Sequence, residues 1–389
     1  MGEIMIEPGI YRYPRMDRVA FGRPWEQVLT EEVERLGKRR VFAIAGSTLA
    51  RTVPIADAMR RALGDRLAGF ATGIRAHTPR EDVIAAAAKA REAGADLIVT
   101  IGGGSVTDAG KMVLLCLAAD AKEPHALDAL RPGEPALERL RALAVRTVAI
   151  PTTLSGGEFT PIAGCTDVAK RLKEGFHHPE MIPQAVILDP RITPHTPMQL
   201  WLSTGIRAVD HAVETLCSIQ VQPLFEATSA HALRLLQHGL IRTKQDPADL
   251  EARLESMLGV WLSLIGIQSG APMAASHGIG HVLGGTAGVP HGFTSCVMLP
   301  HVLRWNKSVN ADRQTLVSAA FGQPQADAGD LVAGLVRKLE LPATLREVGV
   351  TREQLDLIAQ NSMHDRGIAT NPRKIRGPAD VREILELAW

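Results

Sequence analysis

The sequence lacks an excess of charge of either sign. Its 389 residues include 43 Lys and Arg against 42 Asp and Glu, so the formal net charge is +1. A chain with this balance has no long-range field with which to recruit DNA, RNA or an anionic membrane surface. We therefore expect neither a nucleic-acid partner nor a membrane partner.

Long apolar runs are also missing. The longest nearly unbroken apolar stretch covers residues 257–267 and is too short to cross a bilayer. The acidic start MGEIMIEPG does not have the form of a signal peptide. These two absences predict a cytoplasmic protein.

Cysteine is scarce and scattered, with four residues and no CxxC pair. This spacing argues against a disulfide scaffold and a thiolate zinc site, so we expect the cysteines to be small core residues. The apolar fraction of 46% and the charged fraction of 22% are those of an ordinary globular protein. At this length two domains are expected rather than one.

The pattern of apolar residues changes near residue 190. Before it, short apolar runs alternate with helical patterns, which is typical of βαβ units and a mostly parallel sheet. After it, the apolar spacing is helical. The sequence therefore predicts an α/β domain over residues 1–190 and an all-helical domain over residues 191–389. The clearest strands are residues 41–45, 97–101, 148–150 and 185–188.

One helix has both of its ends marked in the sequence. Thr78, Pro79 and Glu81 have the pattern of an N-cap, a proline at the first helical position and a capping box. The alanine-rich stretch that follows predicts a helix ending at Gly94, because glycine adopts a left-handed backbone at little cost.

A glycine-rich loop, GGGSVTD at residues 102–108, follows a predicted strand and precedes an apolar helix. Glycines let a backbone approach a phosphate, while free N–H groups and the helix dipole hold its charge. The loop matches neither common fingerprint, since a Rossmann GxGxxG motif needs glycine at Thr107 and a P-loop needs glycine at Ser105. A tight strand-to-helix turn is the alternative interpretation.

A second loop, PTTLSGGE at residues 151–158, follows another apolar strand. Its small hydroxyl side chains can contact a ribose or a phosphate, and in an open parallel sheet ligands bind at the strand ends. Alone it would be an ordinary Ser/Thr turn. Two such loops favour a nucleotide site over two unrelated turns.

Histidines gather in the helical half. His277 and His281 are four residues apart and share one helix face. His291 lies on a predicted turn in the segment VPHG. Together with His211 and His301 they indicate metal ligation or proton transfer, although a structural role is the alternative for any one of them.

Taken in order, these motifs resemble the iron-containing (group III) alcohol dehydrogenases. The matching segments are GGGSVTDAGK, PTTLSGGE, GIRAVDHAVE, HGIGHVLGGTAGVPHG and LPH. The resemblance implies a dinucleotide-binding N-terminal domain, a helical domain with the substrate or metal site, and hydride transfer across the cleft between them. The segments LGGT, HAVE and TNPR are most similar to the maleylacetate reductase branch.

The resemblance also implies where the cofactor binds. It places the pyrophosphate on the glycine loop, the nicotinamide amide near an aspartate, the adenosine along the second loop and a lysine at the border. The residues so assigned are Gly103, Gly104, Ser105, Asp108, Thr152, Thr153, Leu154 and Lys173.

The residues after the first strand bear on cofactor choice. NAD-specific sites place a carboxylate against the ribose 2′-hydroxyl, and this carboxylate repels a 2′-phosphate. Here the strand ends in GSTLAR, without an acid. Ser47 can bond a ribose or a phosphate and Arg51 can approach a 2′-phosphate, so we expect both NADH and NADPH to serve.

The chain departs from the family at one position. Members that hold iron or zinc use Asp, His, His and His, which correspond here to Arg207, His211, His277 and His291. A guanidinium offers no lone pair to a cation, so a bound metal is doubtful. Asp210 points about 100° away from His211 around a helix and is expected to pair with a surface cation.

Arg207, His211 and Glu214 are spaced i, i+4 and i+7, so they lie on one helix face. A guanidinium there can bind a substrate carboxylate through a bidentate pair and polarise a carbonyl. The resemblance agrees, because the maleylacetate reductase branch is regarded as metal-independent. The alternative is a salt bridge between Arg207 and Glu214 or a neighbouring carboxylate.

The sequence thus predicts an NAD(P)H-dependent oxidoreductase similar to maleylacetate reductases, acting on a small unsaturated oxo-dicarboxylate of aromatic catabolism. Arg207 would anchor a carboxylate and His281 or His277 would deliver a proton. The alternative is an iron- or zinc-dependent dehydrogenase of small alcohols or aldehydes, with His211, His277 and His291 as ligands. The intact motifs disfavour a non-catalytic descendant, and a homodimer is expected.

Overall fold

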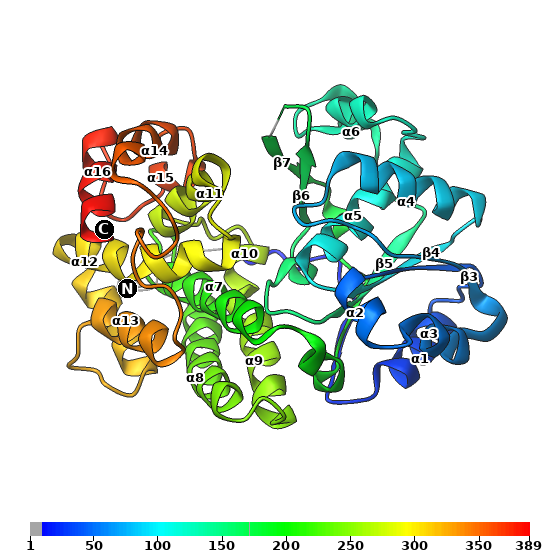
Figure 1. Cartoon of the computed structure of the whole chain (residues 1–389), viewed down its shortest axis with the longest axis horizontal. Coiled ribbons are helices and arrows are strands. Elements are labelled where there is room, and N and C mark those ends of the chain that lie inside the picture. Colours follow the sequence, from blue (N-terminus) through cyan, green and yellow to red (C-terminus); the bar gives the residue numbers. More distant parts are fainter. Residues whose placement is uncertain (1–9, 171) are drawn as a thin grey trace, which may run out of the picture. The chain divides into compact units, whose positions relative to one another are not determined.

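The computed structural model describes residues 10–170 and 172–389, which form two compact units. One is Pro14–Pro197, and the other is Met198–Trp389 together with the described residues before Pro14 (Figure 1). The first is an α/β unit built on a parallel sheet, and the second is helical. The predicted fold class is confirmed.

Six strands form the sheet of the α/β unit: β1 (Arg18–Phe21), β2 (Val41–Ala45), β3 (Leu67–Ala71), β4 (Leu97–Gly102), β5 (Arg146–Pro151) and β8 (Ala185–Leu188). Their order is β1-β8-β5-β4-β2-β3, and neighbouring strands run parallel. The four predicted strands are β2, β4, β5 and β8. The two that were not predicted, β1 and β3, lie at the edges, where half-exposed strands lack a continuous apolar run.

Helices cover both faces of the sheet, because successive side chains of a buried strand point to opposite faces. Phe42 and Ile44 pack on one face, and Val41 and Ala43 on the other. The helices on the first face are α4 (Arg80–Glu92) and α5 (Gly104–Ala118), and those on the second are α1 (Trp25–Arg35) and α3 (Ile55–Leu63). Figure 1 shows these two pairs on opposite sides of the strands.

An antiparallel hairpin of β6 (Ile162–Asp167) and β7 (Leu172–His177) lies outside the sheet. The sequence did not predict it, because Gly164 and Gly175 interrupt its apolar pattern. The other short elements of this unit are α2 (Ser47–Thr52), α6 (Pro135–Arg139) and the 3₁₀ helices η1 (Gly64–Arg66), η2 (Pro124–Leu130), η3 (Gly157–Phe159), η4 (Pro179–Met181) and η5 (Pro190–His195).

The start of α4 differs from the prediction. Thr78 does not cap the helix: its φ is 56°, and its hydroxyl donates to the Ser105 carbonyl oxygen at 3.1 Å. The helix begins at Arg80, and Pro79 occupies the N-cap position. A tertiary contact thus replaces the predicted capping box. The expected end is confirmed, because Gly94, which follows the C-cap residue Ala93, has a φ of 57°.

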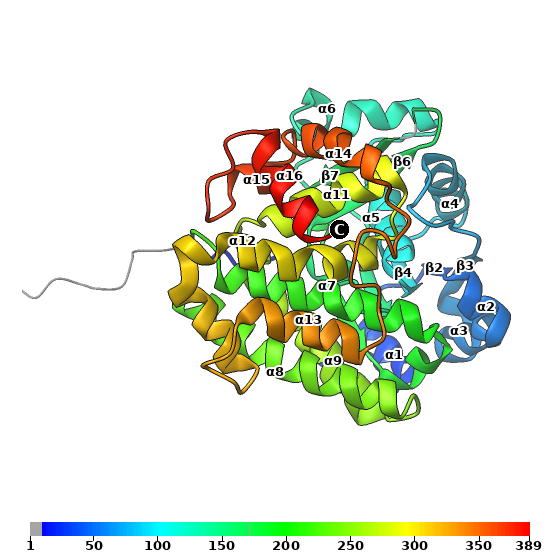
Figure 2. The ribbon, with the colours of Figure 1, turned by 60° about the vertical axis from the view of Figure 1, so that its left-hand side comes forward.

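The helical unit is arranged around a buried central helix, α7 (Met198–Leu216), whose residues from Trp201 onward are all buried. Figure 2 shows α7 between α12 and the pair formed by α8 and α9. The other helices of the unit are α8 (Pro223–Gln245), α9 (Leu250–Ser263), α10 (Ile265–Gln268), α11 (Ala275–Ala287), α12 (His291–Ala320), α13 (Ala328–Lys338), η6 (Arg352–Gln354), α14 (Leu355–Ser362), α15 (Arg366–Ala369) and α16 (Pro378–Leu387).

The structure bears on the expectations drawn from the scarce cysteines and from the lack of long apolar runs. The four cysteines are buried and free, as expected of core residues. In the part of the chain that the structure describes, no helix combines the length and the apolar character that crossing a membrane requires.

Candidate functional site

The two predicted phosphate loops follow adjacent strands. Gly102 at the end of β4 is paired with Pro151 at the end of β5. The Thr152 N–H donates to the Gly102 carbonyl oxygen at 2.9 Å, which joins the two loops where they leave the sheet. The structure therefore brings both motifs to one edge of the sheet.

Ser47 reaches the same edge. The strand order reverses between β2 and β4, since β2 is followed in the chain by β3 on one side and β4 by β5 on the other. Ligands of open parallel sheets bind outside the strand ends at such a reversal. The Gly46 N–H donates to the Ile101 carbonyl oxygen at 2.9 Å, and α2 begins at Ser47.

The glycine loop fits closely against its neighbour. A Cβ at Gly103 would lie 3.0 Å from Thr153 Cγ2, and one at Gly104 would lie 3.0 Å from Ser155 Oγ. Helix α5 begins at Gly104, inside the motif rather than after it, so its free N–H groups belong to the glycine loop itself. These features suit a bound anion.

Ser105 is held from outside the loop. Its hydroxyl oxygen accepts the His77 N–H at 3.2 Å, and its carbonyl oxygen accepts the Thr78 hydroxyl at 3.1 Å. His77 and Thr78 both have positive φ, of 64° and 56°, which is unusual for side chains larger than glycine. Since Ser105 Oγ accepts from the protein, its own hydrogen remains available to a ligand.

Asp108 and Lys173 meet at the β6–β7 hairpin. Asp108 Oδ2 accepts the Gly164 N–H at 3.1 Å, and the absent Gly164 side chain makes room for the Lys173 stem. Burial raises the pKa of Asp108, although Lys111 and Lys173 oppose the shift. The assigned lysine and aspartate are therefore close enough to interact.

A buried cluster of charged residues that the sequence motifs did not predict lies beneath these loops. Lys111 donates to the carbonyl oxygens of Gly157 at 2.5 Å and Ile162 at 2.7 Å. Burial lowers the pKa of Lys111 to about 8 and raises that of Glu158 to about 7. Both residues belong to the quoted motifs, but a buried lysine within an apolar helix pattern has no periodic signal.

The three adenosine-side residues are all buried. Thr152 and Thr153 are each 6% exposed and Leu154 is 1% exposed. The Thr152 carbonyl oxygen accepts the Thr196 hydroxyl at 2.6 Å, which ties the second loop to the end of the unit. The side chains of these three residues therefore pack inside the protein and mainly hold the second loop in place.

The predicted histidine cluster exists within the helical unit. His211 lies on α7, His277 and His281 share a face of α11, and His291 is the first residue of α12 rather than part of a turn. Successive ring centroids are 4.8, 6.4 and 5.9 Å apart along the series from His211 to His291. His301 lies apart from this series and contacts Arg304 at 3.3 Å.

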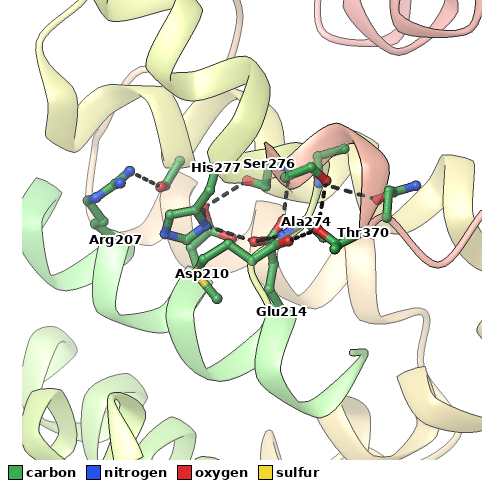
Figure 3. Close-up of polar contacts among 12 residues, drawn as sticks. Arg207, Asp210, Glu214, Ala274, Ser276, His277 and Thr370 are labelled. Atoms are coloured by element: carbon green, nitrogen blue, oxygen red, sulfur yellow. Dashed lines mark hydrogen bonds and ion pairs between the residues drawn. The ribbon is translucent and has the colours of Figure 1, made fainter. Parts of the chain in front are cut away.

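Glu214 anchors the start of α11. Its two oxygens accept the N–H groups of Ala274 at 2.7 Å and Ser276 at 2.9 Å, and His277 Nδ1 lies 2.8 Å from Oε2 (Figure 3). Burial raises the pKa of Glu214 to about 7, although these donors oppose the shift. Glu214 is therefore fully engaged by the protein.

Asp210 does not lie at the surface, so the expected surface ion pair is wrong. It is fully buried and accepts the Ser276 hydroxyl at 2.7 Å, while His277 Nδ1 lies 3.5 Å away (Figure 3). The expectation failed because α7 is buried on all sides from Trp201 onward, so that no face of this part of the helix meets solvent. Burial raises the pKa of Asp210 to about 6.

Arg207 is buried, with 6% of its surface exposed. Its only hydrogen bond in the described residues is a long one from Nη1 to Ser295 Oγ at 3.5 Å (Figure 3). No carboxylate of the described chain lies within ion-pair distance of Arg207, so the alternative salt bridge, with Glu214 or with a neighbouring carboxylate, is not formed. Burial lowers the pKa of Arg207 to about 10, against the pull of Asp210 and Glu214.

The histidines differ in their surroundings. Burial lowers the pKa of His277 to about 3 and that of His211 well below its usual value, so both imidazoles are neutral near pH 7. His281 is half-exposed, and its Nδ1 lies 2.9 Å from Asp365 Oδ2. Sequence reasoning missed Asp365 and Ser295, because neither belongs to a recognisable motif.

The positions that correspond to metal ligands do not fit a metal ion as they are arranged. An imidazole lone pair lies in its ring plane, and zinc, for example, must approach each nitrogen to about 2.0–2.1 Å. The rings of His211 and His277 are stacked with 23° between their planes, so their lone pairs do not converge on one point. The buried Arg207 guanidinium adds a positive charge, which disfavours a second cation.

Comparison with known proteins covers nearly the whole chain. The family model described as "Iron-containing alcohol dehydrogenase" matches residues 17–190, and "Fe-containing alcohol dehydrogenase family, C-terminal" matches residues 201–389. Dehydrogenase FUM7 of Gibberella moniliformis is 33% identical, with 95% of each chain covered. The maleylacetate reductase of Burkholderia cepacia is 31% identical, with 96% of each chain covered.

Solved structures agree with the sequence matches. The crystal structure of maleylacetate reductase from Agrobacterium tumefaciens has a TM-score of 0.84 with this chain, at 27% identity and 99% coverage of both chains. The family models and the two relatives extend over both units of the chain. The chain is therefore an oxidoreductase that belongs to the iron-containing alcohol dehydrogenase family, near its maleylacetate reductase branch.

Proposed function

We propose that this enzyme uses NADH or NADPH to reduce a small unsaturated oxo-dicarboxylate of the maleylacetate type, as formed in aromatic ring catabolism. The observation that carries this proposal is the buried guanidinium of Arg207, which has no carboxylate partner in the described chain. The names of several relatives, maleylacetate reductases at about 30% identity, support the same substrate class.

A buried cation with no carboxylate at ion-pair distance is costly, because Asp210 and Glu214 offset its loss of hydration only in part, and a substrate carboxylate reduces that cost. Charged hydrogen bonds between guanidinium and carboxylate are short and strong, and the planar fork favours a bidentate pair. The same charge would stabilise negative charge that develops on the substrate during reduction. Arg207 thus favours anionic substrates over neutral aldehydes and alcohols.

The nicotinamide cofactor is proposed to lie on the edge of the sheet where the loops at Ser47, Gly103 and Thr152 meet. When bound, it supplies the hydride. The glycines of the loop leave the space that a Cβ would fill, and Ser105 keeps a hydroxyl hydrogen for the pyrophosphate. Asp108 and Lys173 remain the proposed neighbours of the nicotinamide side.

His281 is the proposed proton donor, in preference to His277. His277 is buried and its pKa is low, so the ring is neutral near pH 7, and the one proton of a neutral ring is held at Nδ1 by Glu214 rather than at Nε2. His281 is half-exposed and can exchange protons with solvent. His211 Nδ1 and His277 Nε2 are buried without a hydrogen-bond partner among the described residues, so polar groups of the substrate can form hydrogen bonds with them. Because the residues at the positions of the family's metal ligands do not fit a metal ion as they are arranged, no step of this proposal uses one.

The test is a substrate panel followed through the absorbance of the reduced cofactor. Maleylacetate, a saturated oxo-dicarboxylate and a neutral aldehyde of similar size should differ in kcat/KM. A charged pair worth about 2–5 kcal/mol predicts that maleylacetate is preferred over the aldehyde by at least about 30-fold. Equal or better turnover of the neutral aldehyde would contradict the proposal.

A further inference from the structure

A second carboxylate, from a distant part of the chain, contacts the exposed histidine of the cluster. His281 Nδ1 on α11 lies 2.9 Å from Oδ2 of Asp365, which directly precedes α15. The two residues are 84 positions apart in the sequence. The other histidine of α11, His277, is oriented by a different carboxylate, Glu214, at 2.8 Å.

The carboxylate of Asp365 is fixed on its other side. Its Oδ1 accepts the Gly367 N–H at 2.8 Å and so caps α15. A Cβ at Gly278 would lie 3.1 Å from that oxygen, so the glycine lets the turn approach α11 closely. One oxygen holds the turn and the other is free to orient His281.

The ring of His281 is also constrained by its neighbours. It stacks on His291 with ring centroids 5.9 Å apart and 7° between the planes, and it meets His277 edge-on at 6.4 Å. With Nδ1 engaged by a carboxylate, the proton that can leave the ring is on Nε2. Nearly half of the side chain, 48%, is exposed, so the ring can be reprotonated from water.

We propose that Asp365 is a positioning residue that holds His281 with its Nδ1–H directed at the carboxylate, so that Nε2 delivers the proton of the reduction. This inference rests on the proposed function. After hydride addition leaves an electron pair on the substrate, that pair takes the Nε2 proton, and His281 becomes neutral with its Nδ1–H still bound to Asp365. Water then returns a proton to Nε2.

The first test is Asp365→Asn, which keeps an oxygen for the Gly367 N–H but presents an amide to His281. By analogy with other histidines that lose an orienting carboxylate, we expect the single-turnover rate of reduction to fall by about 10-fold or more. The Kd of NADH and the KM of the substrate should stay within about threefold, because Asp365 does not touch the substrate. An unchanged rate would overturn the proposal.

A matched control is available on α8 and α9. His238 Nδ1 lies 2.8 Å from Glu255 Oε2, and the two side chains are 59% and 23% exposed, close to the 48% and 23% of His281 and Asp365. Glu255→Gln removes the same kind of contact away from the histidine cluster. It should leave the rate of reduction unchanged.

Two further measurements separate orientation from a merely structural effect. In a His281→Gln background, Asp365→Asn should lower the rate of reduction by less than a further factor of about two, because the two residues act as one unit. If Asp365→Asn lowered the rate in that background by as much as it does in the wild-type enzyme, the proposal would be overturned. Nitrogen NMR of labelled histidine should show His281 with its proton on Nδ1 in the wild-type enzyme and on Nε2 in the Asp365→Asn variant.

The NMR measurement needs no substrate, so it separates the two proposals. If the wild-type enzyme reduces no oxo-dicarboxylate, the proposed function fails, while the tautomer of His281 still decides the role of Asp365. A wild-type His281 with its neutral proton on Nε2 would overturn the role of Asp365 whatever the substrate.

Discussion

Replacing Arg207 with methionine removes the guanidinium while keeping an unbranched side chain that can fill much of the same buried space. In the free enzyme the guanidinium makes one long contact, to Ser295 at 3.5 Å, and has no carboxylate within ion-pair distance in the described chain. Arg207→Met therefore breaks one long hydrogen bond and no ion pair, although it also removes the attraction of the guanidinium for the buried Asp210 and Glu214. It removes the group that is proposed to bind a substrate carboxylate.

The expected size of the effect follows from the burial of the pair. Losing one partner of a buried, hydrogen-bonded charge pair costs about 2–5 kcal/mol. At about 1.4 kcal/mol for each tenfold change, kcat/KM for the dicarboxylate should fall by about 30-fold to several thousandfold. The Kd of NADH should not change, because the proposed cofactor loops belong to the other unit.

Steady-state kinetics with the dicarboxylate and fluorescence titration of NADH measure these two quantities. Arg253→Met is the matched control, since Arg253 is 1% exposed, lies in the same unit and packs over the Trp201 ring at 4.8 Å. The Arg253→Met variant should have the same kcat/KM for the dicarboxylate as the wild-type enzyme. Denaturant unfolding should give an Arg207→Met midpoint close to that of the wild type. Unchanged dicarboxylate kinetics, or a large loss of stability with an equal loss for neutral substrates, would refute the reasoning.

Three further predictions concern the α/β unit. Gly104→Val should abolish NADH binding in a folded protein, because the branched side chain would meet Ser155 and block the approach of the pyrophosphate; wild-type affinity by fluorescence quenching would place the phosphate site elsewhere. Glu158, whose pKa burial raises to about 7, keeps its proton in the folded chain at pH values where the unfolded chain has lost it. The free energy of unfolding should therefore fall as pH rises from about 4.5 to 7, by at most about 1.4 kcal/mol per pH unit, and Glu158→Gln should flatten this slope while exposed Glu123→Gln does not. Both cofactors should be used with kcat/KM values within about a hundredfold, and Arg51→Ala should lower the value for NADPH alone; complete rejection of NADPH by the wild type would show that other residues exclude the 2′-phosphate.

The elements that could be predicted from the sequence are those whose pattern is set locally. A buried parallel strand such as Val41–Ala45 is a continuous apolar run, and Gly94 ends a helix because its own backbone allows it. Arg207 and His211 were placed on one face by helical spacing alone. These features need no knowledge of distant residues.

What could not be predicted depends on tertiary contacts. Thr78 looks like a helix cap, but Ser105 takes its hydroxyl. Asp210 was expected to meet a surface cation, yet α7 is covered on every side from Trp201 onward. Asp365 reaches His281 across 84 residues, and no local pattern records such a contact.

The most direct test of the central claim combines metal analysis with activity on one preparation purified without chelator. We predict that protein with much less than one equivalent of iron or zinc per chain reduces maleylacetate at full rate, that added chelator has no effect, and that Arg207→Met loses this activity. Activity that rises in proportion to bound iron or zinc, with a neutral alcohol or aldehyde as the preferred substrate, would contradict the account.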